Sequence, residues 1–282
     1  IGAAVNGPAW QAILPELVPR HELPTAIALG SVGFNVARAI GPALGGVLIA
    51  AAGPWAAFAL NAVSFVGVII VLYQWRREHH ESVLPAERIL GAIGAGIRFA
   101  RHAPMLQTVL VRTATFIVFG SAMWATLPFI ARHEMGLSAI GFGSLMGAFG
   151  VGAVSGAGLM TKLRGRLSVE AMVNGASATF AGLLVALAFI RIFPLVLASM
   201  FAGGISWMIL MSSMNTAAQL ASPSWVRARA MAIYILVFMG GFAAGSALWG
   251  FLAAHGGTTV SLSTAAAGLV AGLVLARKYV IV

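Results

Sequence analysis

Long uninterrupted apolar runs constrain this chain more than any other feature of its sequence. A helix needs about 20 mostly apolar residues to cross a membrane, because each residue rises about 1.5 Å through a hydrocarbon layer about 30 Å thick. Eight stretches reach roughly this length, which predicts an all-α polytopic membrane protein. The stretches are residues 25–50, 55–75, 105–130, 140–161, 169–190, 194–220, 228–254 and 259–276.

The composition excludes several other classes of protein. The chain is 60% hydrophobic and 9% charged, whereas a water-soluble domain is about 25% charged. The absence of Cys excludes disulfide scaffolds, thiolate metal sites and thiol nucleophiles. The apolar runs are continuous instead of alternating, which disfavours an outer-membrane barrel. We find no acid–base or metal constellation at membrane depth, so we expect neither an enzyme nor a bound cofactor.

The basic residues fall mainly on one side of the predicted membrane. Because basic loops stay in the cytoplasm, this side is predicted to be the inside, with the C-terminus cytoplasmic. The same distribution explains the net charge of +10 without a nucleic-acid partner. Only Arg132 and Arg191 fall on the other side, and Arg38 and Arg112 fall within spans. The inside set is Arg20, Arg76, Arg77, Arg88, Arg98, Arg101, Lys162, Arg164, Arg166, Arg227, Arg229, Arg277 and Lys278.

An internal repeat indicates how the spans are organised. Shifting the chain by 204 residues aligns residues 19–53 with residues 223–257 and gives 12 identities in 35 positions. Pro19 aligns with Pro223, and Gly53 aligns with Gly257. Both copies run from an inside loop through a span to the next turn. We therefore predict two six-helix bundles inserted with the same orientation.

The repeat also predicts the domain boundaries. We interpret residues 1–75 as the end of an N-terminal bundle, 76–104 as a cytoplasmic connector, and 105–282 as a C-terminal bundle of six helices. Part of the connector, residues 85–102, can form a surface-lying amphipathic helix. Residues 1–14 are apolar but short, and residue 1 is Ile. We expect the parent to have twelve helices, with about three and a half of them missing here.

Three segments resemble the major facilitator superfamily, in particular its efflux branch of siderophore exporters and macrolide pumps. Residues 15–19, PELVP, are similar to that branch's loop between helices 4 and 5. Residues 37–46, ARAIGPALGG, resemble the helix 5 signature of drug/proton antiporters, although Ala37 replaces an expected Gly. Residues 158–166, GLMTKLRGR, resemble the loop between helices 8 and 9, with Lys162 where an acid is usual.

The resemblance assigns conformational roles to two of these segments. Gly41, Gly45 and Gly46 leave one face of helix 5, the stretch 25–50, without side chains. Pro42 removes a backbone donor and can kink the helix. The resemblance implies that this face contacts the other bundle and limits leak, although tight packing without function remains an alternative. In the loop between helices 8 and 9, the motif residues are Gly158, Lys162, Gly165 and Arg166. A plain orientation signal is the alternative there.

Arg38 is the main candidate for the transport pathway. It lies near mid-membrane by its position in residues 25–50, where a charge must face water, a substrate or a partner. Asp is absent and we place no Glu inside a span, so its counter-ion would come from the missing helices or from the substrate. All six His fall in loops, so we identify no proton carrier. We expect Arg112 to extend its side chain to the inner surface.

The stretches 105–130 and 194–220, which would be helices 7 and 10 of the twelve-helix parent, are expected to line the cavity if the family arrangement holds. Both contain polar and aromatic residues at membrane depth, and several Met residues in helix 10 supply an adaptable apolar surface. Interhelical packing is the alternative role for each single residue. The candidate cavity residues are Asn35, Arg38, Arg112, Thr115, Trp124, Ser206, Trp207 and Asn215.

These observations favour a secondary transporter in the inner membrane of a bacterium. We expect it to export an amphipathic small molecule by alternating access, with protons as the coupling ion. The expected partners are the lipid bilayer, a small-molecule substrate and protons, without nucleic acid, and the protein is expected to be a monomer. An importer, a lipid flippase of the same fold, and a non-transporting receptor or scaffold are the alternatives.

Overall fold

The structure is a computed structural model that describes most of the chain after residue 50. It covers residues 51–74, 89–163, 165–223 and 226–275, together with residues 18, 19, 22, 33, 37, 41, 44–46, 48 and 49. Within these residues the secondary structure is helical and contains no strand, as predicted. Six of the described helical stretches are long and apolar enough to span a membrane.

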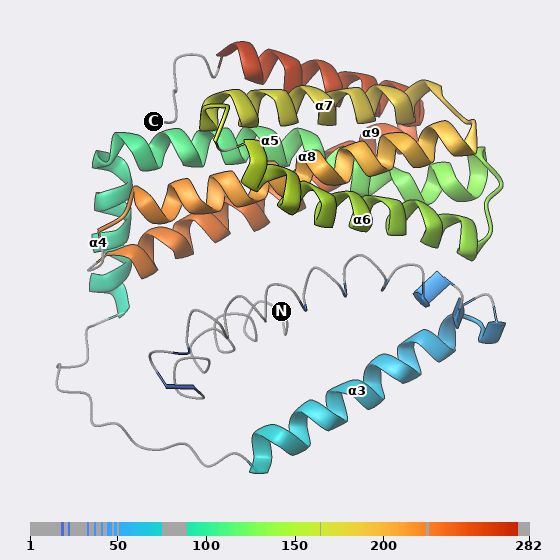
Figure 1. Ribbon diagram of the computed structural model, residues 1–282, viewed down its shortest axis with the longest axis horizontal. Coiled ribbons are helices and arrows are strands. Elements are labelled where there is room, and N and C mark those ends of the chain that lie inside the picture. The colour runs from blue at the N-terminus through green and yellow to red at the C-terminus, as the bar shows by residue number, and fades with distance from the viewer. Residues whose placement is uncertain are drawn as a thin grey trace.

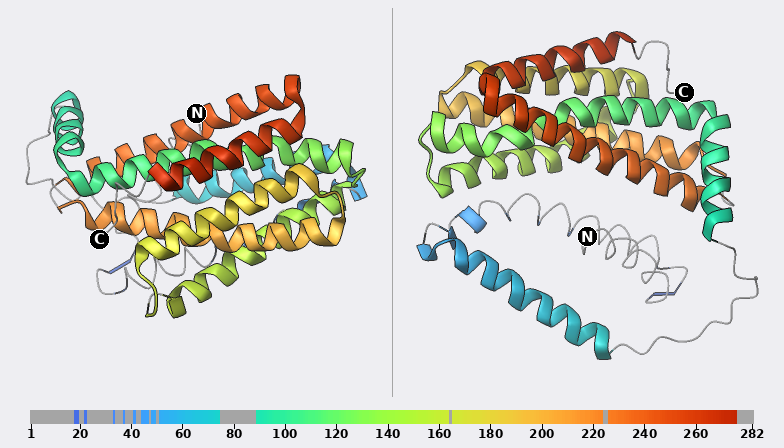
Figure 2. Two further views of the ribbon diagram at one scale, coloured as in Figure 1. Left: turned by 90° about the horizontal axis from the view of Figure 1, so that it is seen from above. Right: turned by 180° about the vertical axis from the view of Figure 1, so that it is seen from behind.

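The helices follow the apolar runs closely. They are α3 (Pro54–Gln74), α4 (Ile89–His102), α5 (Pro104–Phe129) with a terminal π-helical turn η1 (Ile130–Glu134), α6 (Ala139–Leu163), α7 (Val169–Phe189), α8 (Phe193–Leu220) and α9 (Arg227–Leu275). Helix α9 joins the last two predicted spans. It reverses at Gly257, where φ is 85° and ψ is 159°, and Figure 2 shows its two limbs meeting at this turn and spreading apart from it. We call them the first limb (227–256) and the second limb (258–275).

Local signals explain where several of these helices begin. Pro occupies the first turn of both α5 and α8, where its missing N–H has no helical partner to lose. Ser168 caps α7, because its hydroxyl oxygen accepts a hydrogen bond from the Ala171 backbone N–H at 3.1 Å. The predicted connector helix corresponds to α4 from Ile89 to His102, and residues 85–88 of the prediction lie outside the described residues.

Helices α5 to α9 form one bundle of roughly aligned helices, and α4 crosses their ends (Figure 1). α5 packs most extensively on α9, and α6 on α8. Helix α4 packs on α9, where a Cβ added at Gly96 would lie 3.1 Å from the Cβ of Arg229. We call this the α4 end of the bundle and the opposite end the Gly257 end.

Glycines let the helices of the bundle approach each other closely. A Cβ added at Gly156 in α6 would lie 2.8 Å from the carbonyl oxygen of Ile205 in α8. A Cβ at Gly245 in α9 would lie 2.5 Å from the carbonyl oxygen of Val118 in α5. Such backbone contacts are the packing expected in a membrane, where burial of apolar surface gives little drive for helix association.

The apolar surface of the molecule is consistent with a lipid environment. Helix α3 has no buried residue, although it is strongly apolar. Large side chains such as Phe189, Phe251 and Val274 are more than half exposed on the bundle. So many exposed large apolar side chains would be unusual on a water-soluble monomer.

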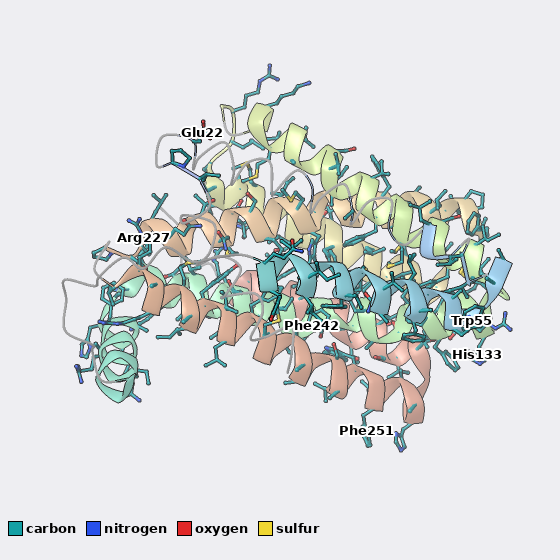
Figure 3. All side chains as sticks on the ribbon, turned by 90° about the horizontal axis from the view of Figure 1, so that it is seen from below. Glu22, Trp55, His133, Arg227, Phe242 and Phe251 are labelled. Atoms are coloured by element: carbon teal, nitrogen blue, oxygen red, sulfur yellow. The ribbon has the colours of Figure 1, made fainter. Side chains whose placement is uncertain are left out.

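The local structure at both ends of the predicted repeat supports its register. The Glu22 N–H donates to the Pro19 carbonyl at 2.9 Å, and at the aligned positions the Val226 N–H donates to Pro223 at 3.1 Å. At the other end, Gly53 and Gly257 both have positive φ, 82° and 85°. Figure 3 shows Glu22 and Arg227 at the α4 end and Trp55, His133 and Phe251 at the Gly257 end. The two copies therefore run in the same direction.

Candidate functional site

A cluster of aromatic rings occupies the middle of the bundle. Trp207 of α8 lies at its centre, with its ring centroid 5.8 Å from that of Phe116, 5.9 Å from Trp124 and 6.0 Å from Phe180. The rings come from α5, α6, α7, α8 and α9, so the cluster ties five helices together. We define the aromatic cluster as Phe116, Trp124, Phe149, Phe180, Trp207, Phe238 and Phe242.

One edge of the aromatic cluster remains accessible. Trp207 is buried, whereas Trp124, Phe238 and Phe242 are only half-buried. The Phe242 ring lies 6.4 Å from that of Trp124. Figure 3, viewed from the side on which α3 lies, places Phe242 midway between the two ends of the bundle. Of the two tryptophans in the cluster, Trp124 is therefore the partly accessible one and Trp207 the buried one.

The predicted polar residues of α5 and α8 form mostly local hydrogen bonds. The Ser206 hydroxyl is buried and donates to the Ala202 carbonyl at 2.9 Å. The Thr115 hydroxyl donates to the Val111 carbonyl at 2.9 Å. Asn215 is half-buried, and its side-chain oxygen accepts a hydrogen bond from Gln219 at 2.7 Å. These contacts satisfy the polar groups within their own helices, as is common in membrane helices.

The sequence led us to expect that Arg112 would extend its side chain to the inner surface. In the structure Arg112 instead forms a buried ion pair. Its side chain is 4% exposed, and its guanidinium is bonded to the carboxylate of Glu170. Asn174 completes the group, because it donates to Glu170 at 2.9 Å and accepts from Arg112 at 3.3 Å. A charge in a low-dielectric bundle is stabilised more by a bonded counter-ion than by a strained path to water.

This ion pair also corrects the prediction that no Glu lies inside a span. Glu170 is in the first turn of α7, where the helix dipole favours a negative charge. It lies 58 residues from Arg112 in the sequence, so no local spacing indicates the contact. The signal that could have identified it is the position of both residues near the same predicted membrane surface.

A small cavity of about 20 Å³ lies beside the ion pair. Arg112 and Thr115 of α5 and Ser177 of α7 supply its polar lining. The rest of the wall is mainly apolar and comes from α5, α7, α8 and the second limb of α9. The cavity is too small for a drug-sized ligand, because such sites measure about 300–1,000 Å³.

A second ion pair closes the Gly257 end of the bundle. Arg191 is bonded to Glu134 at the end of η1, and it also donates to the carbonyls of Leu187 at 2.7 Å and Ile190 at 2.9 Å. The Thr258 hydroxyl donates to the same Glu134 carboxylate. The connections after α5, after α7 and at Gly257 are therefore held together, and the last carbonyls of α7 are capped.

The helix 5 glycines differ in their surroundings. Gly46 is buried, and a Cβ added there would lie 2.6 Å from the Ala139 carbonyl oxygen and 3.3 Å from the Gly143 Cα. Gly41 and Gly45 have nothing within 4 Å of such a Cβ. Because Ala139 begins α6, helix 5 approaches the C-terminal bundle at the Gly257 end.

The remaining predicted residues are described only in part. Lys162, Gly165 and Arg166 are exposed near the α4 end, and Gly158 is exposed on α6. Asn35, Arg38 and Pro42 lie outside the described residues. Within the part of the chain that the structure describes, no group of three His, Asp or Glu side chains is placed to hold a metal ion.

Comparisons with known proteins agree with this architecture. A family described as transmembrane secretion effectors matches residues 1–281. The uncharacterized MFS-type transporter y4rN of Sinorhizobium fredii is 29% identical over 247 residues, which are 85% of this chain and 60% of that protein. The MFS-type transporter YfiS of Bacillus subtilis is 33% identical over 116 residues, 40% of this chain and 28% of YfiS.

A multidrug efflux pump extends the comparison. The pump Tap of Mycolicibacterium fortuitum is 28% identical over 162 residues, 52% of this chain and 39% of the pump. The chain thus spans at most about 60% of the length of these relatives.

A bacterial homolog of the human lysosomal transporter Spinster, solved in an inward-facing and unoccupied conformation, has a similar fold. The TM-score is 0.63 at 15% identity, over 95% of this chain and 72% of that one. The fold and the family match agree on one assignment. This chain belongs to the transmembrane secretion effector family of the major facilitator superfamily.

Proposed function

We propose that this chain is part of a secondary transporter that exports an amphipathic small molecule by alternating access, driven by antiport of protons. Residues 1–75 belong to its N-terminal bundle and residues 105–282 to its C-terminal bundle. The protein works as a monomer in the inner membrane of a bacterium. The match to a secretion family and the resemblance of half the chain to an efflux pump support export.

The accessible edge of the aromatic cluster is the observation that carries the proposal. Trp124, Phe238 and Phe242 offer flat apolar surfaces, and Met211 and Asn215 are half-buried on α8. Aromatic and Met side chains bind varied apolar shapes without demanding fixed hydrogen bonds. Such a wall suits molecules that share amphipathic character instead of one chemical group.

Arg38 supplies the charge that this wall lacks. The repeat aligns it with Phe242, and Asn35 is one turn earlier in the same predicted span. In this proposal Arg38 attracts an anionic group of the substrate or holds a carboxylate in place. The rest of the substrate meets the aromatic edge of the C-terminal bundle.

The basic residues and the glycine contact support an inward-facing state. In the described residues the α4 end carries Arg98, Arg101, Lys162, Arg166, Arg227 and Arg229, and the Gly257 end carries Arg132 and Arg191. The α4 end is therefore cytoplasmic in this proposal, together with the C-terminus. Gly46 meets α6 at the opposite, outer end. Outward opening separates this contact, with Gly41, Pro42 and Gly45 in the moving segment.

The full-length protein in vesicles tests the proposal. We expect a fluorescent amphipathic dye to move from the cytoplasmic side to the other side only when a proton gradient is imposed. Phe242→Ala should raise the KM for the dye, because the accessible aromatic edge loses one ring. Phe251→Ala is the matched control, since Phe251 is 63% exposed on the same limb of α9. Arg38→Ala should abolish energised efflux of an anionic dye.

Three results would reject this function. Movement in the opposite direction would indicate an importer, and movement of labelled lipid alone would indicate a flippase. The absence of gradient-driven flux for every dye would favour a receptor or scaffold. Equal KM values for the Phe242 and Phe251 variants would remove the aromatic edge from the pathway while leaving transport itself intact.

A further inference from the structure

The Arg112–Glu170 pair joins α5 to α7 at the α4 end of the bundle, and it has room beside it. Glu170 is 22% exposed at that end, and the cavity of about 20 Å³ touches Arg112 on the other side. A cavity needs about 10–15 Å³ and two to four polar partners to hold a water molecule. Arg112, Thr115 and Ser177 supply such partners.

Only one member of this pair can change its charge. Arg keeps its proton at every accessible pH, whereas a carboxylate removed from water can be neutralised by taking up a proton. Separating the two ions inside the bundle would leave two unpaired charges, which is strongly unfavourable. A movement of α5 away from α7 therefore becomes accessible when Glu170 is protonated. Arg112 can then donate to the side-chain oxygens of Asn174, Thr115 and Ser177 and to a water molecule held in the cavity.

We propose that Glu170 is a proton-binding site of the C-terminal bundle, and that Arg112 changes partner from its carboxylate to the polar cavity when the proton binds. The proton binds from the Gly257 side when the protein opens outward and leaves to water at the α4 end when the ion pair re-forms, and Arg112 stays positively charged throughout. The conformation described here, with the ion pair formed, is the deprotonated state. The link between this site and flux rests on the proton antiport proposed above.

The helices around the cavity beside the pair present mainly apolar side chains to it. Among the described residues that line the cavity, α8 contributes Leu210 and Met214, and the second limb of α9 contributes Leu269, Gly272 and Leu273. Arg112 is the one charged group in that lining. Lys162 and Arg166 are exposed at the same end, and Arg166 precedes Glu170 by about one helical turn of chain. The charge on Glu170 therefore responds directly to its bonds to Arg112 and Asn174.

Infrared difference spectra of the full-length protein in lipid, between mildly acidic and mildly alkaline pH, test the site directly. We expect a carboxylic acid band at acidic pH that is lost in Glu170→Gln. Glu134→Gln is the matched control, because Glu134 is similarly exposed at 24% and paired with Arg191 at the other end. The band should survive in that variant. If Glu170→Gln fails to fold, Arg112→Gln/Glu170→Gln removes both charges and gives the same test.

Flux measurements then separate this site from the proposed function. Glu170→Gln should lose gradient-driven dye accumulation but keep passive exchange, whereas Glu134→Gln should keep both. A band that persists in Glu170→Gln, or gradient-driven accumulation that survives it, would show that the ion pair is a fixed tie between helices. A band that titrates in a protein without any proton-driven flux would overturn the antiport proposal and leave the proton site standing.

Discussion

Substituting Gly156 with Ala tests how closely α6 and α8 pack. The added Cβ would lie 2.8 Å from the Ile205 carbonyl oxygen, 3.0 Å from the Ile205 Cα and 3.2 Å from the Met208 Cβ. The first distance is about 0.6 Å below the 3.4 Å at which ordinary contact begins. Two of the three obstructing atoms belong to the backbone, so a change of rotamer cannot make room. The helices must move apart.

The size of the effect follows from two opposing contributions. Overpacking of this kind costs about 1–3 kcal/mol, since a gap of about 0.5–1 Å removes a quarter to a half of each neighbouring van der Waals contact. Replacing Gly by Ala in a helix gains about 1 kcal/mol through propensity. We therefore expect a net loss of about 1 kcal/mol for Gly156→Ala. Gly156→Val should lose more, because it adds two methyl groups to a Cβ that already lies 3.2 Å from the Met208 Cβ.

Thermal unfolding of the full-length protein in detergent, followed by size-exclusion chromatography, measures the difference. Gly182→Ala on α7 is the matched control, because Gly182 is exposed and has nothing within 4 Å of an added Cβ. It should be neutral or stabilising through propensity alone. If Gly156→Ala proves as stable as Gly182→Ala, the close approach of the α6 and α8 backbones is wrong.

Two further substitutions probe α9. Trp249→Phe removes the hydrogen bond from the buried indole N–H to the Val118 carbonyl at 2.6 Å. It should lower the free energy of unfolding by about 1 kcal/mol in the same assay. The control Trp55→Phe, at a position that is 71% exposed, should leave stability unchanged. Gly257→Ala places a side chain at φ 85° and ψ 159°, which should cost about 1–3 kcal/mol although the site has open space; an unchanged melting temperature would mean that the turn relaxes.

Much of the fold could be predicted because membrane helices have a strong signal in sequence. The predicted spans 140–161 and 169–190 correspond closely to α6 and α7, since length and hydropathy decide what can cross a membrane. The repeat also predicted that Gly53 and Gly257 are equivalent, and their φ values, 82° and 85°, agree closely. The pattern did not reveal that the two limbs of α9 meet at Gly257 without an intervening loop, because that depends on the backbone angles of a single residue.

The candidate site was less predictable, because it depends on contacts between distant segments. Trp124 and Trp207 could be selected for their membrane depth, but which ring is accessible follows from the packing of five helices around Trp207. Glu170 could not be selected by its depth in the membrane, because a Glu in the first turn of a span is indistinguishable in the sequence from a residue of the preceding loop. Its burial against Arg112 exists only once α5 and α7 lie side by side.

Charged side chains lie at the two ends of the bundle, whereas its middle is uncharged in the described residues. Arg112 with Glu170 marks the α4 end, Arg191 with Glu134 marks the Gly257 end, and between them the described part of the bundle carries aromatic, Met and hydroxyl side chains without a formal charge. Fixed charges at mid-level would demand one complementary group on every ligand, since a buried charge tolerates no unpaired partner. Their absence from this bundle suits the proposed transport of varied substrates, and Arg38 in residues 25–50 is then the mid-level charge that the proposal assigns to the substrate. In the proposed transporter, proton binding and helix locking then occur at the ends of the bundle without restricting which molecule the aromatic wall accepts.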